Sequence, residues 1–458
     1  MKKIVPLKVL QQDQRSSPPP SQTSGRRVSG DTPVSPTDGK KHVELTHIHD
    51  FAAKLCQPDI LPRVKEYVRW QVALRDAQED AQLRGELLDV IPSVPDQAPV
   101  SINLDITTAC NYACDHCVDM DILNKPIKYN HEKLLDSIRL MAEKGLKSVI
   151  VIGGGEPTVY PRFVESVRFM KELGLQIAVV SNGSGMKKIA ELVDCLEETD
   201  WVRLSLDSGS DEVFQAMHLP KRPITLDEIC EGVQAVRDMG PKFQIGFSYI
   251  ITWKGAFIND TKIVENKHEI IMGAERARKY GFDYISYKPF LTRAEENNAE
   301  IVDLRDTDSQ FDEIIAHIRE EVDKAKLLAT DTFRVFEATN LKVFENKSYR
   351  NYTQQPHQCH MQFFRQVLSP LGLYNCPVYR NQPHGRVGDK EAAATPDNFK
   401  DTRSNVANLI NSFDANHECR EVTCLYNHVN WWLEKMIDHP EMLDELEVRE
   451  GGEPDYFL

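Results

Sequence analysis

The sequence predicts an α/β protein: a partial (β/α)6 barrel of the TIM type, followed by a small C-terminal domain that carries cysteines. Two observations support this fold class. Between residues 99 and 292, six short β-branched runs alternate with amphipathic helical stretches, and after residue 292 this rhythm stops. Six β/α units in succession imply a parallel sheet with right-handed crossovers, either doubly wound or curled into part of a barrel. The motifs described below favour the partial barrel.

The chain ahead of the barrel is expected to contain two parts. Residues 1–45 are expected to be disordered, because residues 15–41 are rich in Pro, Ser and Gly and offer almost nothing to bury. Residues 46–98 carry apolar side chains at loosely helical spacing, which predicts a helical lead-in.

Composition narrows the location and the partners. The first residues lack the apolar core of a secretion signal, and no stretch approaches the roughly 18 apolar residues of a membrane helix. A cytoplasmic protein without a membrane partner is therefore expected, in which thiols stay reduced and clustered cysteines more often hold metal than form disulfides. The formal net charge of -15 argues against a broad phosphate-seeking surface, so nucleic acid is not an expected partner.

The barrel segment, residues 99–292, provides its elements in strict alternation. Strands are expected where β-branched residues cluster, and helices where apolar residues recur at helical spacing. The predicted strands span residues 101–108, 147–153, 176–182, 201–207, 243–251 and 283–290, and the predicted helices span residues 131–144, 162–173, 186–196, 225–239 and 268–280.

The remainder of the chain divides into three predicted parts. Residues 293–355 form a helical connection with a charged helix near 308–328, and residues 356–430 form the small cysteine-bearing domain. In that domain, the stretch VLSPLGLYNC predicts a hairpin that brings Cys376 next to Cys359. Residues 431–458 are expected to form a C-terminal helix and an acidic tail.

Three cysteines, Cys110, Cys114 and Cys117, follow the first predicted strand within eight positions. A structural zinc site normally uses four protein ligands, whereas this loop offers three thiols and an awkwardly placed His116. Three thiolates suit a [4Fe-4S] cluster in which one iron has no protein ligand and can bind a small molecule through an amine and a carboxylate. The carboxyl end of a parallel strand is also where α/β folds place their active sites.

The spacing CxxxCxxC, with His116 at the position usually filled by an aromatic or similar ring, resembles the signature of radical S-adenosylmethionine (SAM) enzymes. The resemblance implies a partial barrel, a SAM-binding [4Fe-4S] cluster and bound SAM. It extends to the glycine-rich run after the second strand, which in that family holds the methionine amino group of SAM; the corresponding residues here are Gly153, Gly154, Gly155 and Glu156. A phosphate-binding loop is the alternative, but no GK[ST] follows the glycines.

Polar residues follow the third and fourth predicted strands. By the same resemblance, they are candidates to bind the ribose hydroxyls and the methionine carboxylate of SAM, whereas each taken singly could equally cap a turn or a helix. These candidates are Asn182, Ser184, Ser205 and Asp207.

A second set of cysteines lies in the C-terminal part of the chain, and two pairs brought together could ligate zinc or an iron-sulfur cluster. The set comprises Cys359, Cys376, Cys419 and Cys424. It resembles the auxiliary-cluster extensions of radical SAM enzymes called SPASM and twitch. The longer SPASM form needs about seven or more cysteines, so four favour twitch with one auxiliary [4Fe-4S] cluster. The CxxxxC spacing of Cys419 and Cys424 departs from the common CxxC.

The function that the resemblance implies is reductive cleavage of SAM to a 5′-deoxyadenosyl radical, which takes a hydrogen atom from a substrate. We expect oxidation or epimerisation of a small polar molecule, with the auxiliary cluster carrying electrons and a low-potential donor such as flavodoxin or ferredoxin. A peptide- or protein-modifying maturase is the first alternative, and a non-catalytic iron-sulfur electron carrier or zinc protein is the second. Lys288 and Arg293, at the end of the last strand, are candidates to bind a substrate carboxylate or phosphate, or are simply solvated.

Overall fold

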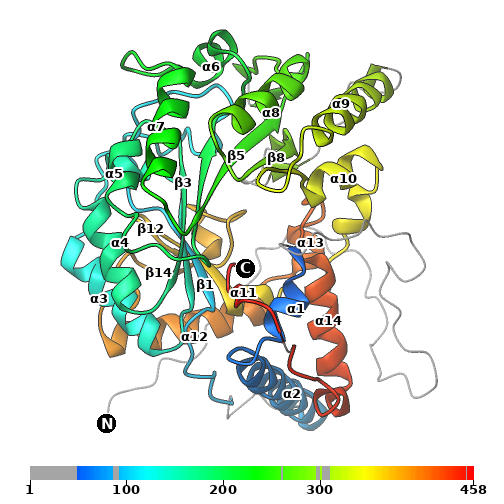
Figure 1. Cartoon of the computed structure of the whole chain (residues 1–458). Coiled ribbons are helices and arrows are strands. Elements are labelled where there is room, and N and C mark those ends of the chain that lie inside the picture. The colour runs from blue at the N-terminus through cyan, green and yellow to red at the C-terminus, as the bar shows by residue number, and fades with distance from the viewer. Residues whose placement is uncertain (1–48, 86–91, 259–260, 295–299, 302–309, 450) are drawn as a thin grey trace. The chain divides into compact units, whose positions relative to one another are not determined.

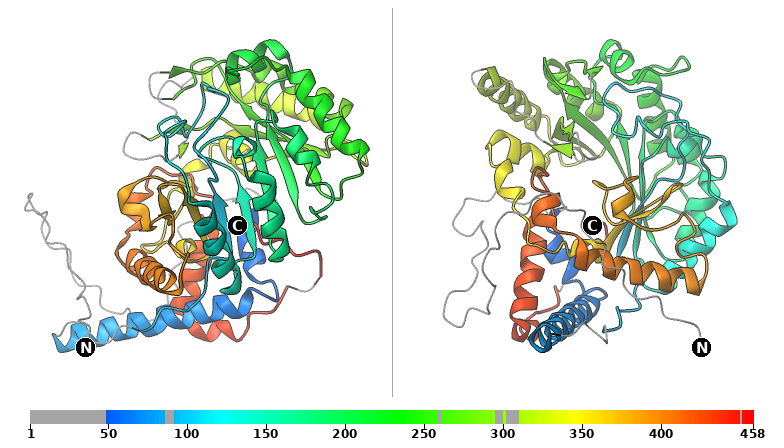
Figure 2. Two further views of the ribbon diagram at one scale, coloured as in Figure 1. Left: turned by 90° about the vertical axis from the view of Figure 1, so that its left-hand side faces the viewer. Right: turned by 180° about the vertical axis from the view of Figure 1, so that it is seen from behind.

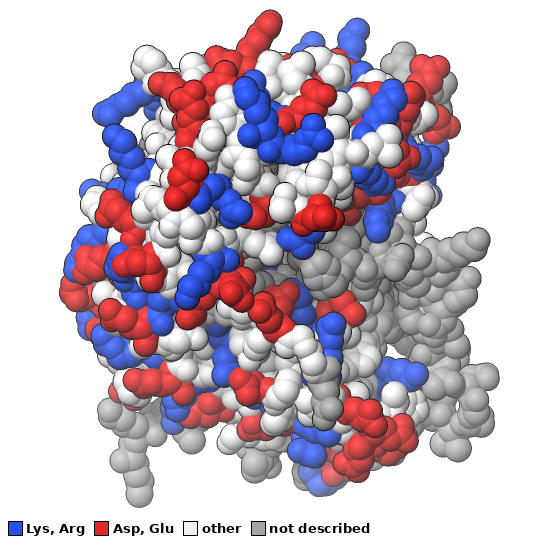
Figure 3. Space-filling model, in the orientation of Figure 1, with Lys and Arg blue, Asp and Glu red and all other residues white. Residues whose placement is uncertain are grey.

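A computed structural model describes residues 49–85, 92–258, 261–294, 300–301, 310–449 and 451–458. The predicted disordered segment, residues 1–45, lies outside the described residues. Within the described part, no helix is both long enough and apolar enough to cross a membrane. Acidic and basic side chains are interspersed over the face shown in Figure 3.

Ten strands of the described chain form one sheet, in the order β11-β8-β5-β4-β3-β2-β1-β12-β13-β14 (Figure 1). The six predicted strands are neighbours in this sheet and all pair in parallel, which confirms the predicted α/β class. Their bounds are β1 Ser101–Leu104, β2 Ser148–Val151, β3 Gln176–Ser181, β4 Trp201–Ser205, β5 Gln244–Ile251 and β8 Tyr284–Pro289.

Four further strands extend the sheet at its two ends. β11 (Arg334–Glu337) pairs in parallel with β8, and β12 (Arg365–Ser369) pairs in parallel with β1. The predicted hairpin is present as β12 and β13 (Gly372–Tyr374), and β14 (Arg386–Gly388) follows it antiparallel. The predicted C-terminal domain thus contributes strands to the same sheet as the barrel, and the domain boundaries stay a prediction.

Helices α3, α4, α5 and α7 lie along one side of the sheet in Figure 1. The helices between the parallel strands are α3 His131–Glu143, α4 Phe163–Glu172, α5 Met186–Ala190, α6 Asp211–His218, α7 Leu226–Asp238 and α8 Ile270–Lys279. The predicted helix over 186–196 is shorter than expected, and α6 was not predicted. The start of α6 is fixed by Ser210, whose side chain accepts a hydrogen bond from the amide of Val213.

Short elements follow β5, and helices complete the C-terminal part. They are β6 Phe257–Ile258, β7 Thr261–Lys262, β9 Thr292–Arg293, β10 Glu300–Ile301, α9 Gln310–Lys326, α10 Thr339–Glu345, α11 Met361–Phe364, α12 Pro396–Ser412, α13 Ala415–Glu418 and α14 Asn427–Asp438.

The helical lead-in supports the second cysteine region. It consists of α1 (Phe51–Leu55) and α2 (Leu61–Arg84), and α2 lies next to α14 (Figures 1 and 2). The buried ring of His360 lies between them: its Nδ1 is 2.8 Å from the hydroxyl of Tyr67 on α2, and its Nε2 is 2.7 Å from the carboxylate of Glu434 on α14. This places residues of the lead-in directly beside Cys359.

The last described residues pack against the amino ends of the strands instead of forming only an acidic tail. Ser148 on β2 donates a hydrogen bond to the carbonyl of Tyr456, and Gln176 on β3 donates one to the carbonyl of Pro454. The ring of Phe457 meets that of Trp201 on β4 at 5.5 Å between centroids. These residues therefore cover the end of the sheet opposite the cysteine loop.

Candidate active site

The first cysteine loop follows β1 at the carboxyl end of the sheet. Its backbone is fixed by Asn124, whose side-chain oxygen accepts a hydrogen bond from the amide of Cys110 at 3.0 Å. Burial raises the pKa of all three thiols, to about 12 for Cys117. The charges of Cys117 and Cys110 add to burial in raising the pKa of Cys114, so the structure brings the three predicted residues together. Thiols of this kind need a cation to be held as thiolates.

The glycine run packs against this loop. A Cβ on Gly155 would lie 2.2 Å from the carbonyl oxygen of Ala109, and one on Gly154 would lie 2.8 Å from the carbonyl oxygen of Thr107. Gly154 also has φ +78°, a conformation that favours glycine. At these two positions, the main reason that glycine is required is the close approach of the cysteine loop. Gly153 lies next to the guanidinium of Arg380.

Glu156 is buried at the junction of β2 and β3. Its Oε1 accepts hydrogen bonds from the amide and the hydroxyl of Thr158 and from the hydroxyl of Ser181, and its Oε2 accepts one from the amide of Asn182 at 2.7 Å. Burial raises its pKa, and these hydrogen bonds oppose the rise. The carboxylate thus fixes two strand ends, and only Oε2 keeps capacity for a further donor such as an ammonium.

Asn182 and Ser184 are tied to the cysteine loop by Asn111. The side-chain amide of Asn182 donates a hydrogen bond to the side-chain oxygen of Asn111 at 2.9 Å. The side-chain amide of Asn111 donates one to the hydroxyl of Ser184 at 2.8 Å. The hydroxyl of Ser184 in turn donates to the side-chain oxygen of Asn182 at 2.6 Å. Both predicted residues therefore lie beside the cysteines, because β3 ends beneath the loop.

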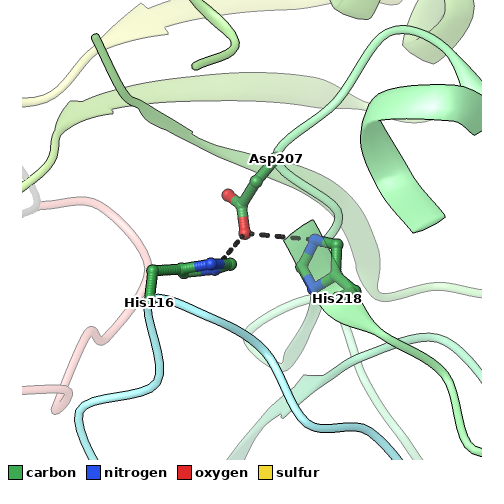
Figure 4. Close-up of side chains that lie close together, drawn as sticks. All are labelled: His116, Asp207 and His218. Atoms are coloured by element: carbon green, nitrogen blue, oxygen red, sulfur yellow. Dashed lines mark hydrogen bonds and ion pairs between the residues drawn. The ribbon is translucent and has the colours of Figure 1, made fainter. Parts of the chain in front are cut away.

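Asp207, after β4, lies between two histidines (Figure 4). Its Oδ2 is 3.3 Å from Nε2 of His116 and 3.6 Å from Nε2 of His218, and its Oδ1 accepts a hydrogen bond from the amide of Ile250. Burial alone would raise the pKa of Asp207, but the hydrogen bond and positive charge of His116 outweigh it and hold the pKa below its usual range. The residue has φ +50°, a strained conformation for a non-glycine residue.

His116 is held by carboxylates on both sides. Its Nδ1 is 2.8 Å from Asp115, and although burial opposes its charge, the bonds to Asp115 and Asp207 raise its pKa to about 9. His218 is different, because burial lowers its pKa to about 4. Its Nε2 donates to the carbonyl of Leu206 at 3.0 Å, which leaves Nδ1 as the acceptor, 3.3 Å from the sulfur of Cys114.

His218 is the residue that sequence reasoning missed. It is the last residue of α6, and no motif marks it. The ligand atoms of His116, Asp207 and His218 lie within 4.8 Å of one another, a spacing that could hold a metal ion. Because Nε2 of His218 donates to Leu206 and the Asp207 carboxylate accepts from His116 and Ile250, we interpret the group as a hydrogen-bonded support of the cysteine loop.

Ser205 stands apart from this network. It is half-buried at the end of β4, where it pairs in register with Ser248 of β5. Tyr249 on the neighbouring strand β5 is fully buried, and its hydroxyl donates a hydrogen bond to the carbonyl of Asn266.

The second cysteine set surrounds one cavity. All four of its cysteines line this cavity: Cys359, Cys376, Cys419 and Cys424. Burial raises the pKa of each thiol, and the charges of the neighbouring cysteines raise it further for Cys359, Cys419 and Cys424. Asn430 donates to the sulfur of Cys359 at 3.6 Å, and the amide of Val378 donates to that of Cys376 at 3.4 Å. This donor set fits a metal centre with four thiolate ligands, whether iron-sulfur or zinc.

Arg380 joins the two cysteine regions. It follows Cys376 by four residues, and its guanidinium contacts Asp105, where β1 ends, at 3.2 Å and Asp119 of the first cysteine loop at 2.5 Å. Asp119 in turn accepts a hydrogen bond from the amide of Gly154. Lys288 and Arg293 are both half-buried, and Arg293 forms an ion pair with Asp121 of the cysteine loop at 2.7 Å.

Comparison with characterised proteins identifies relatives that match part of the chain. Mycofactocin maturase MftC of Mycobacterium tuberculosis is 32% identical over 122 residues, which cover 26% of this chain and 30% of the relative. An S-adenosylmethionine-dependent nucleotide dehydratase of a Thermoplasmatales archaeon is 32% identical over 120 residues, 25% of this chain and 40% of the relative. The matched segment therefore spans less than half of either relative.

Among solved structures, SuiB of Streptococcus suis bound to its precursor peptide is similar, with TM-score 0.47 and 14% identity over 72% of this chain and 70% of that chain. The enzyme anSMEcpe with bound AdoMet and a peptide has TM-score 0.46 and 13% identity over 76% of this chain and 99% of that chain. Residues 104–264 match the model of the radical SAM superfamily, which implies a SAM-binding [4Fe-4S] cluster. In this segment, the chain is therefore similar to the radical SAM superfamily.

Proposed function

We propose that this chain reductively cleaves SAM at a [4Fe-4S] cluster held by Cys110, Cys114 and Cys117. The observation that carries the proposal is the convergence of three half-buried cysteines with the glycine run and the polar strand ends at one edge of the parallel sheet. When bound, the cluster and SAM supply a 5′-deoxyadenosyl radical that takes a hydrogen atom from the substrate.

The chain's own residues would hold the cluster loop in place and orient SAM. Glu156 fixes the ends of β2 and β3, and its Oε2 can accept a hydrogen bond from the SAM ammonium. Asn182, Ser184, Ser205 and Asp207 are proposed to meet the ribose and the methionine carboxylate. His116 is proposed to support the cluster loop through its bond to Asp207, because both of its ring nitrogens already face carboxylates.

We propose a peptide or protein as the substrate. The support is the 32% identity to a maturase over 122 residues. A small polar molecule, the substrate expected from the sequence, is the second candidate, since a nucleotide dehydratase is equally similar over nearly the same length.

The second cysteine set is proposed to hold an auxiliary [4Fe-4S] cluster in a twitch- or SPASM-like domain. Because four thiols line its cavity, every iron would have a protein ligand, and the centre would carry electrons without binding substrate. A low-potential donor such as flavodoxin or ferredoxin is the proposed partner for reduction.

Anaerobic reconstitution tests the proposal. Two [4Fe-4S] clusters correspond to about eight irons per chain, and incubation with SAM and a strong reductant should then release 5′-deoxyadenosine. Cys114→Ala should abolish the release, whereas Cys195→Ala, a half-buried thiol outside both sets, should not. Zinc as the only bound metal, or release that survives Cys114→Ala, would refute the proposed function.

A further inference from the structure

The sheet has a second face that the crossover helices leave uncovered, which we call the inner face. Tyr249 and Ile285 touch Gly273 of α8, so they point to the helix side. Because side chains alternate along a strand, the intervening residues point the other way. Ser205, Ser248 and Ser286 pair in register across β4, β5 and β8 and form a row of three hydroxyls on the inner face.

Arg203 lies on the same face, two residues before Ser205. Its guanidinium stacks over the ring of Trp201 at 5.2 Å. Among the described residues, it forms no hydrogen bond or ion pair, and its Nε is buried without a partner. A buried guanidinium nitrogen without an acceptor is costly, and such an atom in a native protein calls for an explanation.

Lys288 adds a second positive charge to the inner face. It is half-buried and pairs in register with Ile250, two residues beyond the row of hydroxyls. The half-buried ring of His49 lies close enough to feel these charges. Burial first, and then the positive charges of Lys288, Lys54 and Arg203, lower the pKa of His49 to about 3.

This positive region is enclosed at two ends. Toward the amino ends of the strands, Phe457 packs on Trp201, directly beneath Arg203. Toward the carboxyl ends lies Asp207, whose charge acts on Arg203 and which contacts His116 of the cysteine loop. A group bound at Arg203 would therefore lie on the inner face, below the candidate SAM centre.

We propose that Arg203, together with Lys288 and the hydroxyls of Ser248 and Ser286, binds an anionic group of the substrate, either a carboxylate or a phosphate. This inference rests on the proposed function for its choice of ligand, and it deepens that function by assigning a substrate class. A guanidinium and hydroxyls supply the donors that both anions require. The anionic end of the substrate would be anchored deep in the barrel, with the remainder extending toward the cysteine loop.

Binding of two simple anions to the reconstituted protein tests the proposal by calorimetry. Inorganic pyrophosphate is the phosphate probe, and glutarate is the carboxylate probe. Arg203→Met should weaken binding of the preferred probe about tenfold or more, since a hydrogen bond to a charged group is lost. Arg203→Lys should restore part of the affinity, and Arg278→Met, which removes an exposed arginine on the outer helix α8, should have no effect.

Three results would overturn the proposal: neither probe binds the wild-type protein, Arg203→Met binds the probe as well as wild type, or Arg203→Met weakens SAM binding instead. The last result would mean that the guanidinium serves the SAM carboxylate. Should Arg203→Met fail to fold, Lys288→Met replaces it, with the same expected loss. Release of 5′-deoxyadenosine is measured separately, so a failure of the proposed function and a failure of anion binding are distinguished.

Discussion

Arg380→Met should destabilise the protein strongly, although Arg380 belongs to neither set of cysteines. Its guanidinium is 3.2 Å from the fully buried Asp105 and also contacts Asp119, whose side chain is 13% exposed. Removing the arginine would leave two buried carboxylates without a cation. Breaking a buried ion pair by removing one partner costs about 3–5 kcal/mol, and we expect a loss of unfolding free energy in this range at pH 8.

The size of this loss should depend on pH. Burial raises the pKa of Asp105 to about 6 even with Arg380 present. The folded state therefore holds a proton that the unfolded state releases, and the stability linked to that proton is present below about pH 4 and is lost as the pH rises through the folded pKa. Arg380→Met raises this pKa further. The destabilisation should thus be smaller at pH 5, where Asp105 takes up a proton, than at pH 8.

Urea unfolding under anaerobic conditions at both pH values measures the effect. Arg139→Met is the control, because Arg139 and Asp136 form an exposed pair on α3 and its removal should cost less than about 1 kcal/mol. In an Asp105→Asn background, Arg380→Met should cost clearly less, since one carboxylate is gone. The reasoning is refuted if Arg380→Met costs less than about 1 kcal/mol at pH 8, or if its cost is unchanged in the Asp105→Asn background.

Three further changes test the cysteine regions. Glu156→Ala removes the acceptor of four hydrogen bonds and should lower the free energy of unfolding by about 2–5 kcal/mol in urea, and an effect under 1 kcal/mol would contradict the role given to Glu156. Gly155→Ala places a Cβ against the backbone and should reduce reconstituted iron to about four per chain, whereas Gly240→Ala, in open space, should leave iron content unchanged. Cys424→Ser should also lower the iron content to about four per chain, but release of 5′-deoxyadenosine without substrate should continue. If this variant no longer releases 5′-deoxyadenosine, the two sites are not separable.

The sequence was sufficient where the relevant signals are local. Strands such as β3 and helices such as α7 can be predicted from their hydrophobic periodicity. The cysteine and glycine motifs follow strand ends, and a parallel sheet brings these ends together at one edge. The hairpin of β12 and β13 could also be predicted from the sequence, because its turn lies between two adjacent apolar runs.

The elements that were missed depend on distant partners. β12 pairs with β1 from the other end of the chain, and no local pattern specifies that partner. The burial of Arg203 and the approach of His218 to Cys114 arise only after β4 and α6 have packed. The same holds for Glu156. The sequence indicates a carboxylate that can accept hydrogen bonds, but it does not indicate the four hydrogen bonds that this carboxylate accepts from Thr158, Ser181 and Asn182.

Hydrogen bonds and ion pairs connect the two cysteine regions, and these contacts constrain how the proposed auxiliary centre could act. The amide of Asp105, where the first loop begins, donates a hydrogen bond to the carbonyl of Leu368 on β12. Cys359 precedes this strand, Cys376 follows the hairpin, and Arg380 then returns to clamp Asp105 and Asp119. A displacement of the hairpin would therefore move both sets of cysteines together. Such a connection would suit the electron-carrying role proposed for the second set, because it would keep the separation of the two proposed centres constant.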